Sequence, residues 1–226
     1  MSDAGGCHSD RIGLFGCRSP LVVDYIETCN RRDQKVFGVS DNVEIRTGSL
    51  VEVINLETYI KSVVRHKVLP CAFGPRRRNE LWQLAASIGC QMADTLIDPT
   101  AIFPSSLRLG KGGFLNAGVV IGGESFIGDG VVVNRAASLG HHCLVGDWVS
   151  IGPGVTLAGN VQIEPLVVIG AGVTVLPDLR IGKGSVVAAG SVVREHVAEY
   201  KLVAGNPARP RDYDVTRGAL NLSGEE

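Results

Sequence analysis

Residues 133–175 read VNRAASLGHHCLVGDWVSIGPGVTLAGNVQIEPLVVIGAGVTV, and every sixth residue of this stretch, counted from the first, is aliphatic. The same register extends in both directions, so that fifteen successive hexads carry an aliphatic residue without an insertion or a deletion. These residues are Leu109, Leu115, Ile121, Ile127, Val133, Leu139, Val145, Ile151, Leu157, Ile163, Ile169, Val175, Ile181, Val187 and Val193. Hexapeptide periodicity is typical of a parallel β-helix, in which each hexad supplies a short strand and a corner and three hexads close one coil. The series therefore predicts a prism of five coils.

Glycine is concentrated in the same part of the chain. Nineteen of the 29 glycines lie between Asp98 and Arg209, and only 5% of all residues are aromatic. A narrow prism accepts small aliphatic side chains but no large rings, and its corners need small residues, sometimes with positive φ. Because glycine follows the inward aliphatic residue at positions 122, 128, 140, 146, 152, 170 and 182, we expect glycine to meet this need at the corners.

Residues 11–97 have different periods and predict a small Rossmann-like α/β unit. We expect strands at 11–16, 35–39, 68–73 and 92–97, and helices at 20–30, 56–64 and 76–88. Strands and helices that alternate at this spacing form βαβ units around a parallel sheet.

Composition and charge exclude several classes of protein. The 226 residues contain 22 Lys and Arg against 23 Asp and Glu, so no basic excess favours nucleic acid as a partner. The longest apolar runs, such as residues 166–175, are interrupted by glycine well before the roughly 20 residues that a membrane-spanning helix needs. The first ten residues, MSDAGGCHSD, lack the apolar core of a signal peptide, and the six cysteines form no C-x-x-C pair. We therefore expect a cytoplasmic protein with reduced thiols.

The pair His141 and His142 directly follows an inward aliphatic residue and its glycine. Because residues 18 apart stack about 4.8 Å from one another in such a coil, His141 is expected to point outward between Gly123 and Gly159. The same rule places His142 between Glu124 and Asn160, and Asn134 between Asn116 and Gly152. From spacing alone this set is either a functional polar cluster or a group of exposed corner residues.

A metal site is the less favoured interpretation of these histidines. A zinc hydratase built on such a prism gathers three histidines at one subunit junction. The chain has only His8, His66, His141, His142 and His196, and His196 lies three coils away from His142. We therefore expect no metal.

Four motifs resemble those of the bacterial sugar acyltransferases of the PglD/NeuD type. They are residues 133–147, Ala158-Gly159-Asn160, Val175-Leu176-Pro177 and Val203-Ala204-Gly205-Asn206-Pro207-Ala208-Arg209. That family joins a Rossmann-like domain to a left-handed β-helix, in the order found here, and the resemblance covers about residues 11–210. It implies a disordered N-terminus at 1–10, a Rossmann-like nucleotide-sugar-binding domain at 11–97, a left-handed β-helix acyltransferase domain at 98–200 and a C-terminal loop and tail at 201–226.

The resemblance also implies an activity. Acetyl-CoA would donate an acetyl group directly to the amine of a nucleotide-linked amino sugar, for surface polysaccharide or lipopolysaccharide synthesis, in a homotrimer. His141 matches the general base, Gly159 supplies a backbone N–H to the oxyanion, and Asn134 faces the acceptor amine. Coenzyme A would touch Ser150, Gly170, Ala171 and Ala189, and the loop that carries Arg209 would close over its nucleotide end.

The sequence departs from the family pattern near the base. His142 stands where the family has Asp or Glu, and Glu124 is a candidate to supply the missing charge to His142. Ser150 replaces a second histidine of the coenzyme A site. Sugar O-acetylation, or a β-helix that binds or assembles without catalysis, remain the alternatives to N-acetylation.

A further departure lies in the first loop. The family's loop reads roughly G-x-G-G-H-G, whereas here Gly16 is followed by Cys17, Arg18 and Ser19. Arg18 and Ser19 either contact a phosphate at the start of the helix or only cap that helix. The other residues expected at the nucleotide sugar are Asp41, Asn42 and Gly74.

Overall fold

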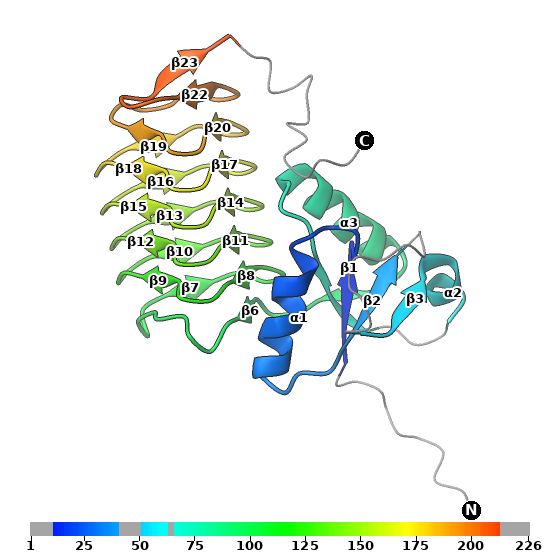
Figure 1. Cartoon of the computed structure of the whole chain (residues 1–226). Coiled ribbons are helices and arrows are strands. Elements are labelled where there is room, and N and C mark those ends of the chain that lie inside the picture. Colours follow the sequence, from blue (N-terminus) through cyan, green and yellow to red (C-terminus); the bar gives the residue numbers. More distant parts are fainter. Residues whose placement is uncertain (1–10, 41–50, 63–65, 213–226) are drawn as a thin grey trace, which may run out of the picture.

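The predicted periodic residues each end a two-residue strand. The computed structural model describes residues 11–40, 51–62 and 66–212. The strands are β7 (Arg108–Leu109), β8 (Phe114–Leu115), β9 (Val120–Ile121), β10 (Phe126–Ile127), β11 (Val132–Val133), β12 (Ser138–Leu139), β13 (Leu144–Val145), β14 (Ser150–Ile151), β15 (Thr156–Leu157), β16 (Gln162–Ile163), β17 (Val168–Ile169), β18 (Thr174–Val175), β19 (Arg180–Ile181), β20 (Val186–Val187) and β21 (Val192–Val193). They form the stacked coils of a parallel β-helix (Figure 1).

Three parallel sheets make the faces of this prism. The first face consists of β7, β10, β13, β16 and β19, and the third face of β9, β12, β15, β18 and β21. The second face contains β8, β11, β14, β17 and β20 and is extended at its two ends by β6 (Leu96–Ile97) and β22 (Leu202–Ala204). Strand β23 (Arg209–Arg211) pairs antiparallel with β22. Partner residues on strands β6 to β21 are 18 apart, as in Leu139 with Leu157, so the predicted coil length is confirmed for these coils. The last coil is shorter, because Val187 pairs with Val203.

The core of the prism is a column of Val, Ile and Leu side chains. From Leu115 to Val193 every residue of the predicted series is buried, and Leu109 is partly buried. The residue two positions earlier also points inward at many steps, as Val119, Ala137 and Cys143 do. These side chains are small enough to interdigitate in a narrow space, which explains the scarcity of aromatic residues.

The predicted reason for the corner glycines was wrong in one respect. The glycines that directly follow the inward residue do not have positive φ. Glycine is required at these positions because the next coil leaves no space for a side chain. A Cβ on Gly122 would lie 2.5 Å from the backbone N of His141, and one on Gly140 would lie 2.7 Å from the N of Gly159. The positive φ falls two residues later in the hexad, where His142 has φ 57° and Gly154 has φ 65°.

The N-terminal unit is a five-stranded parallel sheet in the order β3-β2-β1-β4-β5. Its elements are β1 (Ile12–Phe15), α1 (Val22–Arg31), β2 (Val36–Ser40), β3 (Val53–Asn55), α2 (Leu56–Lys61), β4 (Lys67–Pro70), α3 (Pro75–Ser87) and β5 (Gln91–Met92). The single strand expected at 92–97 was wrong. Its first residue ends β5, which pairs with β4, and its last two form β6, which pairs with β8 on the prism.

Helix α1 lies between the N-terminal sheet and the second face of the prism (Figure 1). Side chains alternate along β1, so Leu14 packs with α1 whereas Phe15 packs on the opposite side with Tyr59 of α2. The ring of Tyr25 on α1 lies 4.1 Å from the ring of Phe114 on β8, centroid to centroid. The two units therefore share one apolar interface.

A buried arginine fixes α3 against the prism. Arg78 is completely buried, and its guanidinium donates to the carbonyl oxygens of Ala72 and Gly130, at 2.6 Å each, and of Val149 at 3.0 Å. Burial lowers the pKa of Arg78 to about 10, so the group stays charged at neutral pH. The carbonyl dipoles replace its water shell, and through these hydrogen bonds Arg78 ties α3 to the prism.

Of the helices that the structure describes, none is both long and apolar enough to cross a membrane.

Candidate active site

The ring of His141 lies at the corner where the third face turns into the first. Its side chain is exposed, and the pairing of β12 with β15 places Gly159 in the next coil beneath it. A Cβ built on Gly159 would lie 2.7 Å from Cε1 and 2.8 Å from Nε2 of His141, so only glycine leaves room for this ring. The imidazole thus rests on bare backbone, with Nε2 close to it.

The backbone N–H of Gly159 is a free donor at the same corner. It makes no hydrogen bond to any other residue of the described segments, whereas the carbonyl oxygen of Gly159 accepts one from Asp178. A free N–H beside an imidazole nitrogen is an arrangement that can stabilise negative charge near a group that accepts a proton.

His142 is the hydrogen-bond partner of His141. The two Nδ1 atoms are 3.0 Å apart, and the rings are nearly perpendicular, at 87°. If both rings are neutral, one Nδ1 carries the proton and the other accepts it. When His141 is the donor, its Nε2 keeps a lone pair that faces the corner and is able to accept a proton.

Glu124 lies one coil away from His142, as predicted. The backbone N–H of Glu124 binds the Ser106 hydroxyl at 3.0 Å. In the part of the chain that the structure describes, the Glu124 carboxylate forms no hydrogen bond with the His142 ring. The relay through Glu124 stays a prediction.

The predicted polar residues do not form one cluster within a single chain, so this prediction was wrong. Asn134 and Asn116 lie at a different corner, where the second face turns into the third, and Asn116 Nδ2 donates to Asn134 Oδ1 at 2.9 Å. Asp24 of α1 accepts from Asn116 at 3.0 Å and pairs with Arg135 at 3.1 Å. Since corners repeat only every 18 residues, His141 and Asn134 occupy opposite edges of the third face.

The residues expected to hold coenzyme A follow Asn134 along its corner. A Cβ on Gly170 would lie 2.5 Å from the backbone N of Ala189, and Gly152 packs in the same way on Ala171. Gly170, Ala171 and Ala189 therefore form a column without large side chains. Arg209 lies on β23, at the C-terminal end of the prism, and forms an ion pair with Glu195 at 2.7 Å.

The prediction that Ser150 contacts coenzyme A is contradicted by its position. Ser150 is completely buried on the second face, where its hydroxyl donates to the carbonyl oxygen of Phe73 and accepts from Arg78 at 3.0 Å. The N-terminal unit covers this part of the prism, so the Ser150 side chain helps to anchor α3 and faces no ligand.

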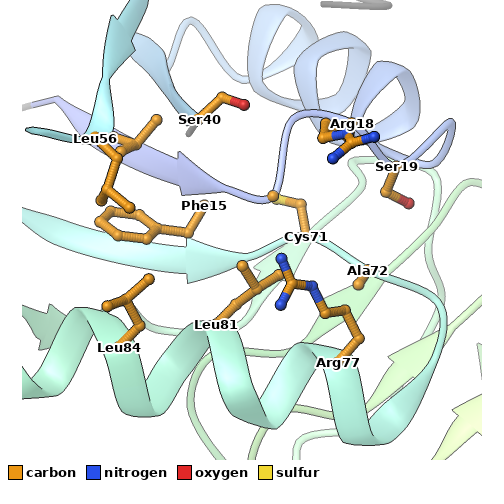
Figure 2. A pocket seen from close by; sticks show the side chains of 12 residues that line it. Phe15, Arg18, Ser19, Ser40, Leu56, Cys71, Ala72, Arg77, Leu81 and Leu84 are labelled. Atoms are coloured by element: carbon orange, nitrogen blue, oxygen red, sulfur yellow. The ribbon is translucent and has the colours of Figure 1, made fainter. Parts of the chain in front are cut away.

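An open pocket lies in the N-terminal unit, at the carboxyl ends of β1, β2 and β4 (Figure 2). This is where open α/β sheets bind ligands, because the strand order reverses there. The lining residues are Phe15, Gly16, Arg18, Ser19, Val39, Ser40, Leu56, Cys71, Ala72, Arg77, Leu81 and Leu84.

Three of the predicted nucleotide residues line this pocket. They are Gly16, Arg18 and Ser19; Gly16 has φ 98°, and a Cβ on it would lie 2.8 Å from the carbonyl oxygen of Cys71. Gly74 is the N-cap of α3 and does not line the pocket. Asp41 and Asn42 lie outside the described residues. Sequence reasoning missed Arg77, although its place in the first turn of a helix that follows a strand was a usable signal.

Among the described residues, neither a nucleophilic thiol nor a metal cluster lies near His141. Cys143 is completely buried in the prism, and burial raises the pKa of its thiol. In residues 11–40, 51–62 and 66–212, no three His, Cys, Asp or Glu side chains are grouped so that they could hold a metal ion. The corner therefore offers acid–base chemistry from its histidines.

Comparisons with known proteins agree with the repeat fold of the prism. The family model for the bacterial transferase hexapeptide (six repeats) matches residues 124–159 and 160–195. A sequence search of the curated proteins found no significant match.

Several solved structures are similar over nearly the whole chain. PerB from Caulobacter crescentus, in complex with CoA and GDP-perosamine, is 27% identical with a TM-score of 0.80, over 88% of this chain and 96% of its own. The acetyltransferase domain of PglB from Neisseria gonorrhoeae, with acetyl coenzyme A, is 26% identical with a TM-score of 0.83, over 90% and 100%. WeeI from Acinetobacter baumannii is 25% identical with a TM-score of 0.77, over 88% and 99%. These matches confirm the predicted resemblance and the left-handed β-helix after an α/β unit.

Proposed function

We propose that this chain, an acetyl-CoA-dependent acyltransferase that resembles the PglD/NeuD-type sugar enzymes, acetylates the amine of a nucleotide-linked amino sugar with His141 as the general base. The observation that carries the proposal is the ring of His141 on the bare backbone of Gly159. PerB, 27% identical, was solved with CoA and a nucleotide-linked amino sugar, which supports the same pair of substrates here.

His141 would take the proton that the amine loses as it attacks. Imidazole titrates near neutral pH, which suits a general base under cellular conditions. Its Nδ1 is held by His142 at 3.0 Å, so that the ring keeps Nε2 directed to the corner. In this chain the imidazole of His142 takes the position that a carboxylate has in the family.

Acetyl-CoA supplies an acetyl group activated as a thioester. Gly170, Ala171 and Ala189 would hold it along a corner free of large side chains, near Arg209 at the end of the prism. The free N–H of Gly159 would stabilise the charge that gathers on the carbonyl oxygen. Transfer is direct in this mechanism, because Cys143 is buried and its thiol pKa is raised.

The site needs a second copy of the chain, and we propose a homotrimer. Within one chain His141 and the coenzyme A residues lie at opposite edges of the third face. Large apolar side chains are exposed on the two faces that meet at the His141 corner, including Val120 on the third face and Phe126 and Leu144 on the first. A neighbouring chain that covers them would bring its own coenzyme A corner toward His141.

The test is acetyl-CoA turnover with a panel of UDP-, GDP- and dTDP-linked amino sugars, measured by thiol release. The native protein should turn over at least one sugar, and His141→Ala should abolish this turnover while Cys143→Ala retains it. Trapping an acetyl group on Cys143 would contradict direct transfer. Mass spectrometry of the product separates N-acetylation from O-acetylation.

A catalytically inactive binding or assembly subunit is the second candidate. The replacement of the usual carboxylate by His142 favours it. Binding of acetyl-CoA and nucleotide sugars without thiol release for any member of the panel would support this candidate.

We place the reaction in the cytoplasm, in surface polysaccharide synthesis. The five cysteines that the structure describes, Cys17, Cys29, Cys71, Cys90 and Cys143, are free and buried, which suits a reducing compartment.

A further inference from the structure

Two arginines from different elements extend into the pocket of the N-terminal unit. Arg18 follows β1, and Arg77 lies in the first turn of α3; Figure 2 shows their side chains reaching into the pocket from its two sides. Both residues are exposed. No Asp or Glu is among the lining residues that the structure describes, so no acidic side chain of the described lining offsets these two positive charges.

Neither guanidinium is committed to the fold. Arg18 makes no hydrogen bond or ion pair with any residue in the described segments, and Arg77 has one exposed contact, with Glu80 at 3.5 Å. An exposed pair at that distance contributes little to stability. Both groups are therefore available to a ligand.

The start of α3 adds positive potential to the same end of the pocket. Helix α3 begins without a side-chain cap, and its first turn contains no acidic residue. Uncapped N–H groups and the helix dipole favour an anion at such a place. Helix α1 contributes less, because its first N–H groups donate to the carbonyl oxygens of residues 19–21 and its first turn contains Asp24. The burial of Arg78, next in sequence to Arg77, fixes this end of α3 and hence the position from which Arg77 reaches out.

The opposite end of the pocket is apolar. Phe15, Leu56 and Leu84 lie together there, apart from the arginines (Figure 2). A ligand with a flat apolar body at one end and a strongly anionic group next to it matches both ends. A nucleoside diphosphate has this form.

We propose that Arg18 and Arg77 clamp the diphosphate of the nucleotide-linked sugar, in place of a glycine-rich loop. A guanidinium binds phosphate oxygens through two parallel N–H bonds, and one from each side suits two linked phosphates. The base would lie against Phe15, Leu56 and Leu84, and the sugar would leave the pocket at the arginine end, where Arg78 touches the prism. This inference rests on the proposed function for the identity of the ligand as a sugar nucleotide.

Calorimetric titration with GDP and UDP, and with GMP and UMP, tests the clamp on the full chain. We expect a nucleoside diphosphate to bind about tenfold more tightly than the corresponding monophosphate, and Arg18→Gln and Arg77→Gln each to weaken diphosphate binding about tenfold. Arg76→Gln is the matched control, since Arg76 is exposed on the same helix turn but does not line the pocket. It should leave binding unchanged.

Three outcomes would overturn the clamp. They are no binding of GDP or UDP, unchanged binding in the Arg18→Gln Arg77→Gln double variant, and an equal loss in Arg76→Gln. The thiol-release assay separates this inference from the proposed function. Turnover with an unaltered KM for the sugar in both variants removes the clamp and leaves the acyltransferase. Weaker diphosphate binding in both variants, without turnover of any sugar, supports the clamp and removes the acyltransferase.

Discussion

The bare backbone of Gly159 makes the position of His141 sensitive to a single methyl group. In Gly159→Ala the new Cβ would lie 2.7 Å from Cε1 of His141, so the ring must move away from the corner. Gly159 does not have positive φ, so alanine is compatible with the backbone. We expect kcat to fall about 100-fold, because a catalytic group displaced by about 1 Å loses that much, while the melting temperature changes little.

Gly123 offers the matched control on the other side of His141. A Cβ on Gly123 has Ser106 Oγ at 3.7 Å as its nearest neighbour, which is an ordinary contact. Gly123→Ala should keep native kcat. A similar loss in both variants would show that the effect of Gly159→Ala comes from the corner backbone and not from the ring of His141.

His142 is the hydrogen-bond partner of the proposed base, and its replacement tests whether a negative charge beside His141 changes the reaction. In His142→Asp a carboxylate would accept from Nδ1 of His141 and favour the protonated ring. The acid limb of the pH profile of kcat/KM should therefore move to higher pH, by about one unit. Residue 142 has φ 57°, which Asp and Asn tolerate, so His142→Asn serves as the neutral control. Profiles of the Asp and Asn variants that coincide would contradict a charge effect on His141.

At the scale of elements, α1 is joined to the first coil through a buried carboxylate. Asp98 is 1% exposed and accepts from Thr28 at 2.8 Å, from Thr100 at 2.7 Å and from Arg31. Burial raises the pKa of Asp98, but the hydrogen bonds from Thr100, Thr28 and Arg31 outweigh it and hold the pKa well below its usual range. The charged form is therefore the one that stabilises the fold.

The stability from Asp98 should depend on pH with a definite sign. A lowered pKa in the folded state means that the stabilisation is full above about pH 4, the value for an unfolded chain, and is lost as the pH falls further. Asp98→Asn should cost about 2 kcal/mol at pH 7, and the difference from the native protein should shrink below pH 4. Urea unfolding at several pH values measures it. A pH-independent difference would assign the effect to packing alone.

The sequence predicts these elements best where one physical requirement repeats. Each hexad has to bury an aliphatic residue, so the strands from β7 to β21 follow directly from the period. Strand β3 has only three residues, too few to show alternation, and was missed. The segment 92–97 reads as one apolar strand, but its two ends pair with different sheets, and only the packing of the two units decides this.

For the whole molecule, the sequence predicts which residues stack on one another along one corner of the prism. It does not predict which residues of different corners, or of the N-terminal unit and the prism, come together. The 18-residue rule correctly placed Gly159 at His141, because both lie in one column. It does not place Asn134 there, since seven residues separate two different corners. It also does not show that α3 covers Ser150, because that contact depends on Arg78, a residue of the other unit. The part of the site that depends on assembly is thus the part to test by experiment.

Mixed assemblies test whether one active site is built from two chains. If His141 of one chain works with Asn134 of its neighbour in a trimer, the variants His141→Ala and Asn134→Ala are inactive alone. Co-expressed in equal amounts, they should recover about a quarter of native turnover, because a site is intact when each of its two chains carries the needed residue. His141→Ala mixed with Gly159→Ala should recover nothing beyond the residual activity of the second variant, since these two residues stack in one chain. If the mixture with Asn134→Ala shows no recovery while light scattering shows mixed trimers, both residues act from one chain and the site between subunits is wrong.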